Sequence, residues 1–232
     1  MRLRGLPYVL DPELDPVFPD HLVPDEHGLV AVGGELSGRV LLEAYSKGIF
    51  PWFNAPPLMW FSPDPRTVLF PEKFHVSDRL ARQLRQGRFQ TGFDRDFEEV
   101  MLGCATTPRP HEQGTWIDRH YLAAYTRLHR RHVTHCVAVY SEGRLCGGLY
   151  GVALGGIFFG ESMFSRLPNA SKIALAHLVA RLREMGFLLI DCQARTEHLI
   201  LLGAEEIPRT RFLGLLAEGL RLPDHRCPWT VA

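Results

Sequence analysis

Apolar and polar positions recur with regular spacing along most of the chain after residue 37. Ser37 precedes a segment whose apolar residues lie on one helical face and which ends at Gly48. The same helical spacing predicts five further helices, over 77–86, 118–128, 171–185, 197–202 and 209–220. The helix over 171–185 ends before Gly186, a residue typical of helix ends.

Strand patterns fill the middle of the chain between the third and fourth of these helices. Residues 134–164 read as three strands separated by turn signals at Glu142-Gly143 and at 154–156. The apolar run that begins at Phe187 predicts a buried strand ending in Asp191, Cys192 and Gln193. A meander, a helix, a further strand and a last helix predict an α+β fold, with a mixed sheet and flanking helices of the acetyltransferase (GNAT) type.

The chain changes character near residue 65, which predicts two domains. Residues 1–27 are rich in Pro and Asp and read as an irregular arm or short edge strands, and five aromatic residues fall between Phe50 and Phe61. Prolines at 63 and 65 then precede the more regular pattern. We therefore expect a small N-terminal domain over 1–65 and a larger domain over 66–232.

Composition excludes several classes of protein. The chain has 232 residues, 46% hydrophobic and 22% charged, and no apolar run approaches the roughly 18 residues of a membrane span. Five cysteines without a CxxC pair and scattered histidines argue against a disulfide framework and a metal site. No secretory signal is evident, so we expect a cytoplasmic protein with no membrane partner. Residues 1–65 carry nine acidic against four basic side chains, which leaves a weakly basic remainder.

Asp191 is the first candidate for chemistry, because a carboxylate at the end of a buried strand needs partners. In a regular strand Asp191 and Gln193 share a face and Cys192 points the other way. Spacing leaves two interpretations equally open. The pair forms a polar site, or Asp191 caps the next helix or pairs with an arginine such as Arg195.

Glu161 is the second candidate, since it too follows an apolar strand. The string GESMF lacks the final glycine of a hydrolase nucleophile elbow, so nucleophilic catalysis is disfavoured. The nearest match to a coenzyme A loop, RLCGGL, ends in leucine inside a strand, and there is no Walker loop and no GxGxxG after a strand. We therefore expect no nucleotide cofactor.

Aromatic and basic side chains suggest contacts to nucleic acid. The aromatic side chains of Trp52, Trp116, Tyr45 and Tyr125 could stack on unpaired bases, although packing in the core is the simpler interpretation of each. Arginines at 79, 82 and 85 line one side of the helix predicted over 77–86 and could contact phosphates. A solvated helix face is the alternative for them.

Several unusual strings then occur together: GLVAVGGELS, GIFPWF, WFSPDPR, GTWI, GGLYGV, FGESMFSR, NASK, LIDCQ and LGAEEIPR. From about Gly28 to Arg211 the chain closely resembles the bacterial leucyl/phenylalanyl-tRNA–protein transferase family. The resemblance implies transfer of Leu or Phe from aminoacyl-tRNA to the α-amino group of proteins that begin with Arg or Lys, which creates a degradation signal under the N-end rule. It also implies an acetyltransferase-like body without coenzyme A and with no cofactor.

The resemblance also implies roles for residues that match the family's motifs. Trp52 and Trp116 resemble the pair that clamps the terminal adenine of the tRNA, and Asp191, Gln193 and Glu161 resemble the polar centre. Other implied substrate contacts are Tyr45, Tyr125 and Gly160. Phe158, Met163 and Ile190 resemble walls of the apolar pocket for the Leu or Phe side chain, and Leu178 and Leu182 stand where related chains carry phenylalanine on its helix side. That departure bears on the pocket's volume and on the preference between Leu and Phe.

Aminolysis of an aminoacyl ester requires placement of the amine, removal of its proton and stabilisation of the oxyanion. Our hypothesis is that Asp191 and Gln193 orient the amine and accept its proton, directly or through a relay, while Glu161 holds the aminoacyl end or the acceptor's positive charge. Alternatively Asp191 recognises that charge. Two other functions compete with transfer: a non-catalytic tRNA- or N-degron-binding module, and a coenzyme A-dependent acetyltransferase.

Overall fold

The computed structural model describes residues 7–11, 13–14, 17–20, 22–52, 56–108 and 115–230. Helical segments in this part are α1 (Gly38–Ser46), the 3-10 turn η1 (Pro71–Lys73), α2 (Asp78–Gln86), α3 (Phe97–Thr106), α4 (Arg119–His129), α5 (Ala170–Glu184), α6 (Glu197–Leu201) and α7 (Arg209–Gly219). Its strands are β1 (Tyr8–Leu10), β2 (Leu29–Gly33), β3 (Phe50–Trp52), β4 (Met59–Phe61), β5 (Arg66–Leu69), β6 (Gln90–Phe93), β7 (Thr134–Ser141), β8 (Arg144–Leu154), β9 (Ile157–Ser165), β10 (Leu189–Gln193) and β11 (Glu205–Ile207).

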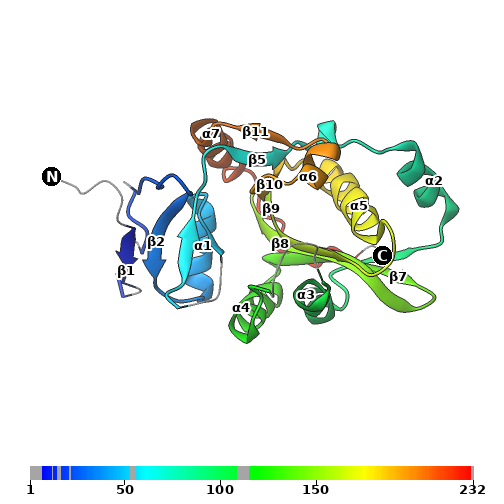
Figure 1. The fold of residues 1–232 in the computed structure, drawn as a ribbon, viewed down its shortest axis with the longest axis horizontal. Coiled ribbons are helices and arrows are strands. Elements are labelled where there is room, and N and C mark those ends of the chain that lie inside the picture. Colours follow the sequence, from blue (N-terminus) through cyan, green and yellow to red (C-terminus); the bar gives the residue numbers. More distant parts are fainter. Residues whose placement is uncertain are drawn as a thin grey trace.

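The strands form two mixed sheets. The smaller has the order β1-β2-β4-β3, with β1 and β2 parallel. The larger has the order β11-β5-β10-β9-β8-β7-β6, and only β9 and β10 in it run parallel. Figure 1 shows α5 over one face of the larger sheet and α3 and α4 on the opposite face. The predicted α+β class, with a mixed sheet and flanking helices, is confirmed.

Most of the predicted elements form where the sequence places them, and local chemistry explains why. Ser37 and Asp118 accept hydrogen bonds from the first turns of α1 and α4. Glu142 and Gly143 both have positive φ, the geometry of the tight turn that joins β7 and β8. The pattern did not predict β2 to β6, η1, α3 or β11, which are short or lie between stronger signals.

The junction between the two sheets is continuous and apolar. One buried cluster extends from Val40 and Phe50, beside the small sheet, to Phe159 and Tyr125 of the larger sheet and its helices. The chain passes from β4 in the small sheet to β5 in the large sheet within a few residues. A domain border at residue 65 stays a prediction.

The parallel strands β9 and β10 separate partway along their length. They pair only from Leu189 with Ile157 to Asp191 with Phe159, whereas β9 continues beside β8 to Ser165. At the same point the register between β10 and β5 shifts between Asp191 and Gln193. This separation leaves side chains at the ends of two apolar runs free to meet groups from other elements.

Candidate active site

Three hydrogen-bond donors from three different elements converge on Glu161 of β9. The hydroxyl of Tyr45, from α1, donates to Oε1 over 2.6 Å, and the hydroxyl of Tyr125, from α4, donates to Oε2 over 3.0 Å. Gln193 of β10 donates from Nε2 to Oε1 over 2.9 Å. The two tyrosine hydroxyls also lie within hydrogen-bond distance of each other. The site therefore forms only when the N-terminal helix, α4 and the large sheet pack together.

The hydrogen-bond partners of Glu161 are neutral, so burial has the largest effect on its pKa. Burial disfavours its charged form, and the nearby charge of Asp191 acts in the same direction, so that the pKa of Glu161 is raised to about 7 although the three donors oppose the rise. Burial, followed by the charge of Glu161, raises the pKa of Tyr45 and of Tyr125 well above their ordinary value. Both phenols therefore stay protonated near neutral pH and Glu161 can exchange a proton there.

Asp191 has a different environment, because it is fully buried in an ion pair with Arg66 of β5. The Arg66 guanidinium donates from Nε to Oδ1 over 2.7 Å and from Nη2 to Oδ2 over 2.6 Å. Neither residue has solvent-exposed surface. The guanidinium also lies against the rings of Phe50 and Phe212, 4.8 and 4.5 Å from their centres.

The structure corrects the expectation for Asp191 and its neighbours. The arginine that pairs with Asp191 is Arg66; Arg195 pairs instead with Glu197 and Glu206. Helix α6 is capped by Thr196, so Asp191 is not its cap.

Gln193 departs from regular strand geometry. It has a φ of 64°, in the left-handed region, and follows the register shift on β10. The simple alternation of faces that the sequence predicted for Asp191 and Gln193 therefore breaks here. The backbone N–H of Gln193 donates to Asp191 Oδ1 over 2.9 Å, which holds this uncommon conformation. The ion pair thus supports the residue whose side chain reaches Glu161.

The predicted side-chain pocket coincides with an apolar cluster on the α5 side of the large sheet. Phe158 pairs with Ile190 across β9 and β10, and both are buried. Leu178 and Leu182 of α5 are buried in the same cluster, with Met163 packed against it. A Cβ added at Gly160 would meet only ordinary contacts with β10, at 3.6 Å and beyond, so this glycine leaves room beside Glu161.

The two tryptophans come from different segments and pack against the same apolar cluster. Trp52 of β3 packs against Phe50 and Phe61 in its own sheet, whereas Trp116 lies before α4 with its ring 5.2 Å from that of Tyr121. Both tryptophans are half-buried. Tyr121 in turn stacks on Tyr125, whose hydroxyl binds Glu161. An unbroken series of aromatic rings therefore leads from Trp116 to the polar centre.

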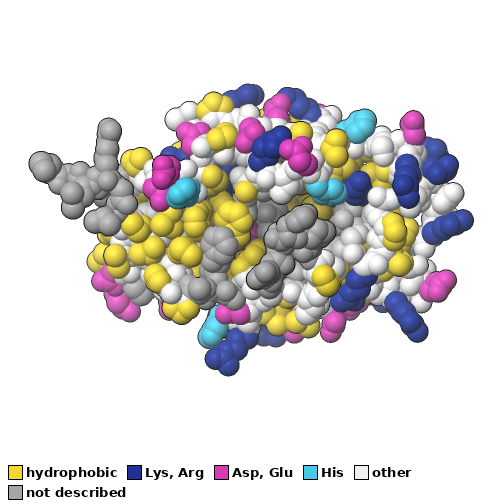
Figure 2. Space-filling model, in the orientation of Figure 1, with side chains coloured by type: hydrophobic (Ala, Val, Ile, Leu, Met, Phe, Trp, Pro, Cys, Tyr) yellow, Lys and Arg dark blue, Asp and Glu magenta, His cyan; other side chains and the backbone are white. Residues whose placement is uncertain are grey.

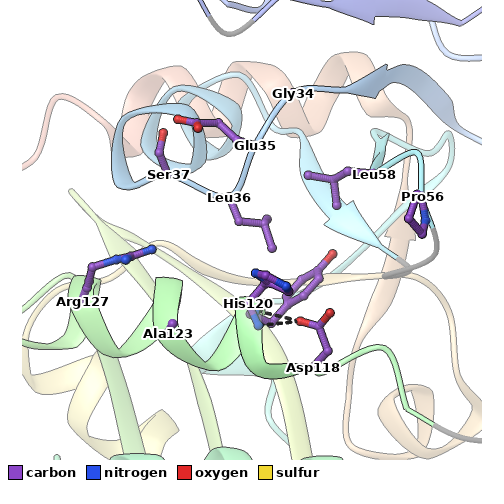
Figure 3. A pocket seen from close by; sticks show the side chains of 11 residues that line it. Gly34, Glu35, Leu36, Ser37, Pro56, Leu58, Asp118, His120, Ala123 and Arg127 are labelled. Atoms are coloured by element: carbon purple, nitrogen blue, oxygen red, sulfur yellow. Dashed lines mark hydrogen bonds between the residues drawn. The ribbon is translucent and has the colours of Figure 1, made fainter.

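A cavity of about 480 Å³ opens beside this aromatic series. Figure 3 shows it between the segment around Leu36 and Leu58 and helix α4, which contributes His120 from its first turn and Arg127 from its last. Tyr121 lines the same cavity. Its volume lies within the usual range for small-molecule sites.

The arginines of α2 lie far from the cluster around Glu161. Arg79, Arg82 and Arg85 are exposed on a helix at the opposite end of the molecule from the small sheet, where Figure 2 shows Lys and Arg side chains gathered. Their contact with tRNA stays a prediction.

The part of the chain that the structure describes contains neither a metal-binding group of side chains nor a membrane-spanning helix. No three or more His, Cys, Asp or Glu side chains in it are grouped to hold a metal ion. None of its helices has the length and apolarity needed to cross a bilayer.

Arg66 is the residue of the site that sequence reasoning missed. A usable signal was present: Arg66 begins the apolar run RTVLF just as Asp191 ends another. A buried charge needs an opposite partner, and the ends of neighbouring strands in a sheet can supply one.

Comparison with known proteins gives a consistent result. The family model described as leucyl/phenylalanyl-tRNA protein transferase matches residues 68–217, and the model of its N-terminal domain matches residues 34–64. A leucyl/phenylalanyl-tRNA–protein transferase from Anaeromyxobacter sp. (strain K) is 50% identical over 94% of each chain. One from Azotobacter vinelandii (strain DJ / ATCC BAA-1303) is 54% identical over 85% of this chain and 88% of its own.

Among solved structures, a GCN5-related N-acetyltransferase from Kribbella flavida aligns with 71% of this chain and 59% of its own, at 11% identity and a TM-score of 0.39. The family match covers more than half of the chain, and it includes the strands that carry Glu161, Asp191 and Gln193. The chain therefore belongs to the leucyl/phenylalanyl-tRNA–protein transferase family of aminoacyltransferases.

Proposed function

We propose that this protein transfers Leu or Phe from the 3′ end of aminoacyl-tRNA to the α-amino group of a protein that begins with Arg or Lys. The observation that carries the proposal is the environment of Glu161. It is a carboxylate held by two phenols and an amide, with a pKa raised to about 7, at the point where two strands separate. A group with this pKa can take the proton of an attacking amine at neutral pH.

In the proposed reaction the acceptor's α-amine attacks the ester carbonyl of the aminoacyl group. A C–N bond forms and the C–O bond to the ribose breaks. Glu161 accepts the proton that the amine loses and returns it to the ribose oxygen as that oxygen leaves, so the carboxylate is regenerated. Since the ester is an activated acyl group, the reaction needs no further energy source and the protein contributes placement and proton transfer.

Gln193 and Asp191 have separate parts in this proposal. Gln193 is half-buried beside Glu161 and orients the amine. Asp191 has no exposed surface and both its oxygens face Arg66, so its effect on the amine passes through the backbone of Gln193. Recognition of the acceptor's charge by Asp191 is disfavoured because Arg66 already neutralises it.

The aromatic junction is proposed to bind the tRNA end. The terminal adenine stacks on Trp52 and Trp116, and the cavity beside Tyr121 accommodates the adjoining nucleotide atoms near His120 and Arg127. The apolar cluster around Phe158 and Ile190 takes the Leu or Phe side chain. Exposed arginines of α2 contribute phosphate contacts farther along the tRNA.

The preference for a cationic first residue is proposed on electrostatic grounds. Among the described residues Glu161 has no cationic partner. Its carboxylate favours a positively charged acceptor. A cytoplasmic location is part of the proposal and fits the five cysteines, which are all free.

One assay tests the proposed function. The full chain is incubated with Leu-tRNA carrying labelled leucine and with peptides that differ only in their first residue: Arg, Lys or Ala. We expect label on the Arg and Lys peptides and none on the Ala peptide or on an Arg peptide whose amine is acetylated. Binding of Leu-tRNA without transfer would instead support the non-catalytic module. Labelling from acetyl-coenzyme A in a parallel reaction would support an acetyltransferase.

A further inference from the structure

The segment after α7 returns to the large sheet and buries a tryptophan there. Trp229 has no exposed surface, and its ring stacks on His135 of β7 with the centres 3.9 Å apart and the planes 6° from parallel. This C-terminal tail, residues 220–230, lies beyond residue 217, where the family match ends. It therefore packs against the sheet without being part of the matched region.

The tail is attached to the sheet by hydrogen bonds to two aspartates. Asp94 accepts the backbone N–H of Trp229 over 2.7 Å and binds Nδ1 of His135 over 2.9 Å. Burial alone would raise the pKa of Asp94, but the hydrogen bond and charge of His135 outweigh it and lower that pKa. A second attachment is made by Asp224, which accepts the N–H of Gly155 over 2.8 Å. Trp229 is thus held in one position.

Trp229 also contacts a residue of the proposed side-chain pocket. Its ring centre lies 5.9 Å from that of Phe158 and 5.8 Å from that of Phe187. Phe158 and Trp229 belong to the apolar cluster that also contains Ile190. The tail therefore contacts the proposed side-chain pocket through Phe158.

A glycine of the neighbouring strand confines Phe158 from another direction. A Cβ placed on Gly151 of β8 would lie 2.5 and 2.6 Å from two carbons of the Phe158 ring, so the ring fills the space that the glycine leaves. With Gly151 on one side and Trp229 on another, the ring has little freedom to move. The buried position of Phe158, which is 1% exposed, agrees with this confinement.

We propose that Trp229 is a positioning residue for Phe158 and thereby sets the volume available to the transferred side chain. The inference rests on the proposed function, because it assigns Phe158 to the pocket that holds Leu or Phe. Removal of the indole lets the Phe158 ring move away from the pocket, which enlarges it. The larger pocket favours Phe over Leu, because the bulkier side chain then fits with less strain.

The test is a competition assay in which the full chain receives Phe-tRNA and Leu-tRNA together, with an Arg peptide as acceptor. For Trp229→Leu we expect the ratio of Phe to Leu transfer to rise on the order of fivefold, below the roughly tenfold that a whole methylene can be worth. Trp229→Phe should shift the ratio less, in the same direction, and carries the test if Trp229→Leu does not fold. Because both substrates compete for the same molecules, the unfolded fraction cancels from the ratio.

Two further variants separate positioning from a general loss of packing. His225→Ala removes the ring that stacks on Phe187 but leaves Trp229 on Phe158, and should leave the ratio unchanged. In a Phe158→Leu background the effect of Trp229→Leu on the ratio should disappear. An unchanged ratio in both Trp229 variants, or a shift that persists without Phe158, overturns the inference alone. A wild-type chain that transfers neither amino acid overturns the proposed function and this inference with it.

Discussion

Glu161 and Asp191 are carboxylates on adjacent parallel strands, yet their environments differ in kind. Asp191 is neutralised by the buried guanidinium of Arg66 and has no contact with solvent. Glu161 meets only phenol and amide donors, and its pKa is raised to about 7. With this pKa Glu161 can gain and lose a proton near neutral pH, whereas both oxygens of Asp191 accept from one guanidinium. This difference underlies the proposed roles, which are support for Asp191 and proton transfer for Glu161.

The largest expected effect follows from removal of the exchangeable proton at Glu161. We expect Glu161→Gln to lower the rate of transfer about 10²- to 10⁴-fold, the range typical of a lost general base. Stability should change little, because the amide oxygen can still accept from Tyr45 and Gln193, and the amide N–H can donate to the Tyr125 hydroxyl, which accepts as well as donates. Single-turnover transfer from Leu-tRNA to an Arg peptide measures the rate, and urea unfolding measures the stability. Glu218→Gln, on an exposed part of α7, is the matched control. A rate within tenfold of wild type would remove Glu161 from the chemistry.

Glu161→Gln should affect the rate of transfer and not the stability, whereas removal of the Arg66 cation that pairs with Asp191 should affect the stability. Arg66→Met leaves Asp191 as an unpaired buried charge, and we expect a loss of about 3–5 kcal/mol in the free energy of unfolding. The double variant Arg66→Met with Asp191→Leu has no buried charge and should regain most of that stability. Urea titrations of the three proteins decide the point. A double variant as unstable as the single one would mean that packing around Phe50 and Phe212, not charge, dominates this region.

The contrast between the two carboxylates also shows how much of the site could be predicted from the sequence. Asp191 and Glu161 both follow apolar runs, and the pattern identified both strands and both carboxylates as needing partners. It could not show which partners they find, because Arg66 lies 125 positions before Asp191, in a strand of four residues. A strand that short, following prolines, has too little periodicity to identify. The left-handed conformation of Gln193 was equally hidden, since it depends on a hydrogen bond to Asp191 that forms only in the folded sheet.

The raised pKa of Glu161 predicts that stability depends on pH, an effect smaller than the loss expected for Arg66→Met. Between about 4.5, the ordinary pKa of a glutamate, and about 7, the folded protein keeps a proton that the unfolded chain has already lost. The free energy of unfolding therefore falls as pH rises through this window, by the share that Glu161 contributes. Urea titrations at pH 4.5 to 7.5 should show a shallower decline for Glu161→Gln than for wild type. Parallel curves for the two proteins would contradict the raised pKa.

Tyr45→Phe gives the finest test, because it alters the acidity of Glu161 without removing a charged group. The hydrogen bond from the Tyr45 hydroxyl lowers the pKa of Glu161, so its loss should raise that pKa above about 7. The pH profile of kcat/KM should therefore shift to higher pH. The acceptor's own α-amine loses its proton near pH 8, so the profile is referred to that of Glu161→Gln with the same peptide. Tyr140→Phe, whose hydroxyl binds Asp96 on another part of the sheet, is the matched control and should leave the profile in place. A profile that stays unmoved in Tyr45→Phe would mean that Glu161 is not the titrating group, and the distinction between the two carboxylates would then rest on stability alone.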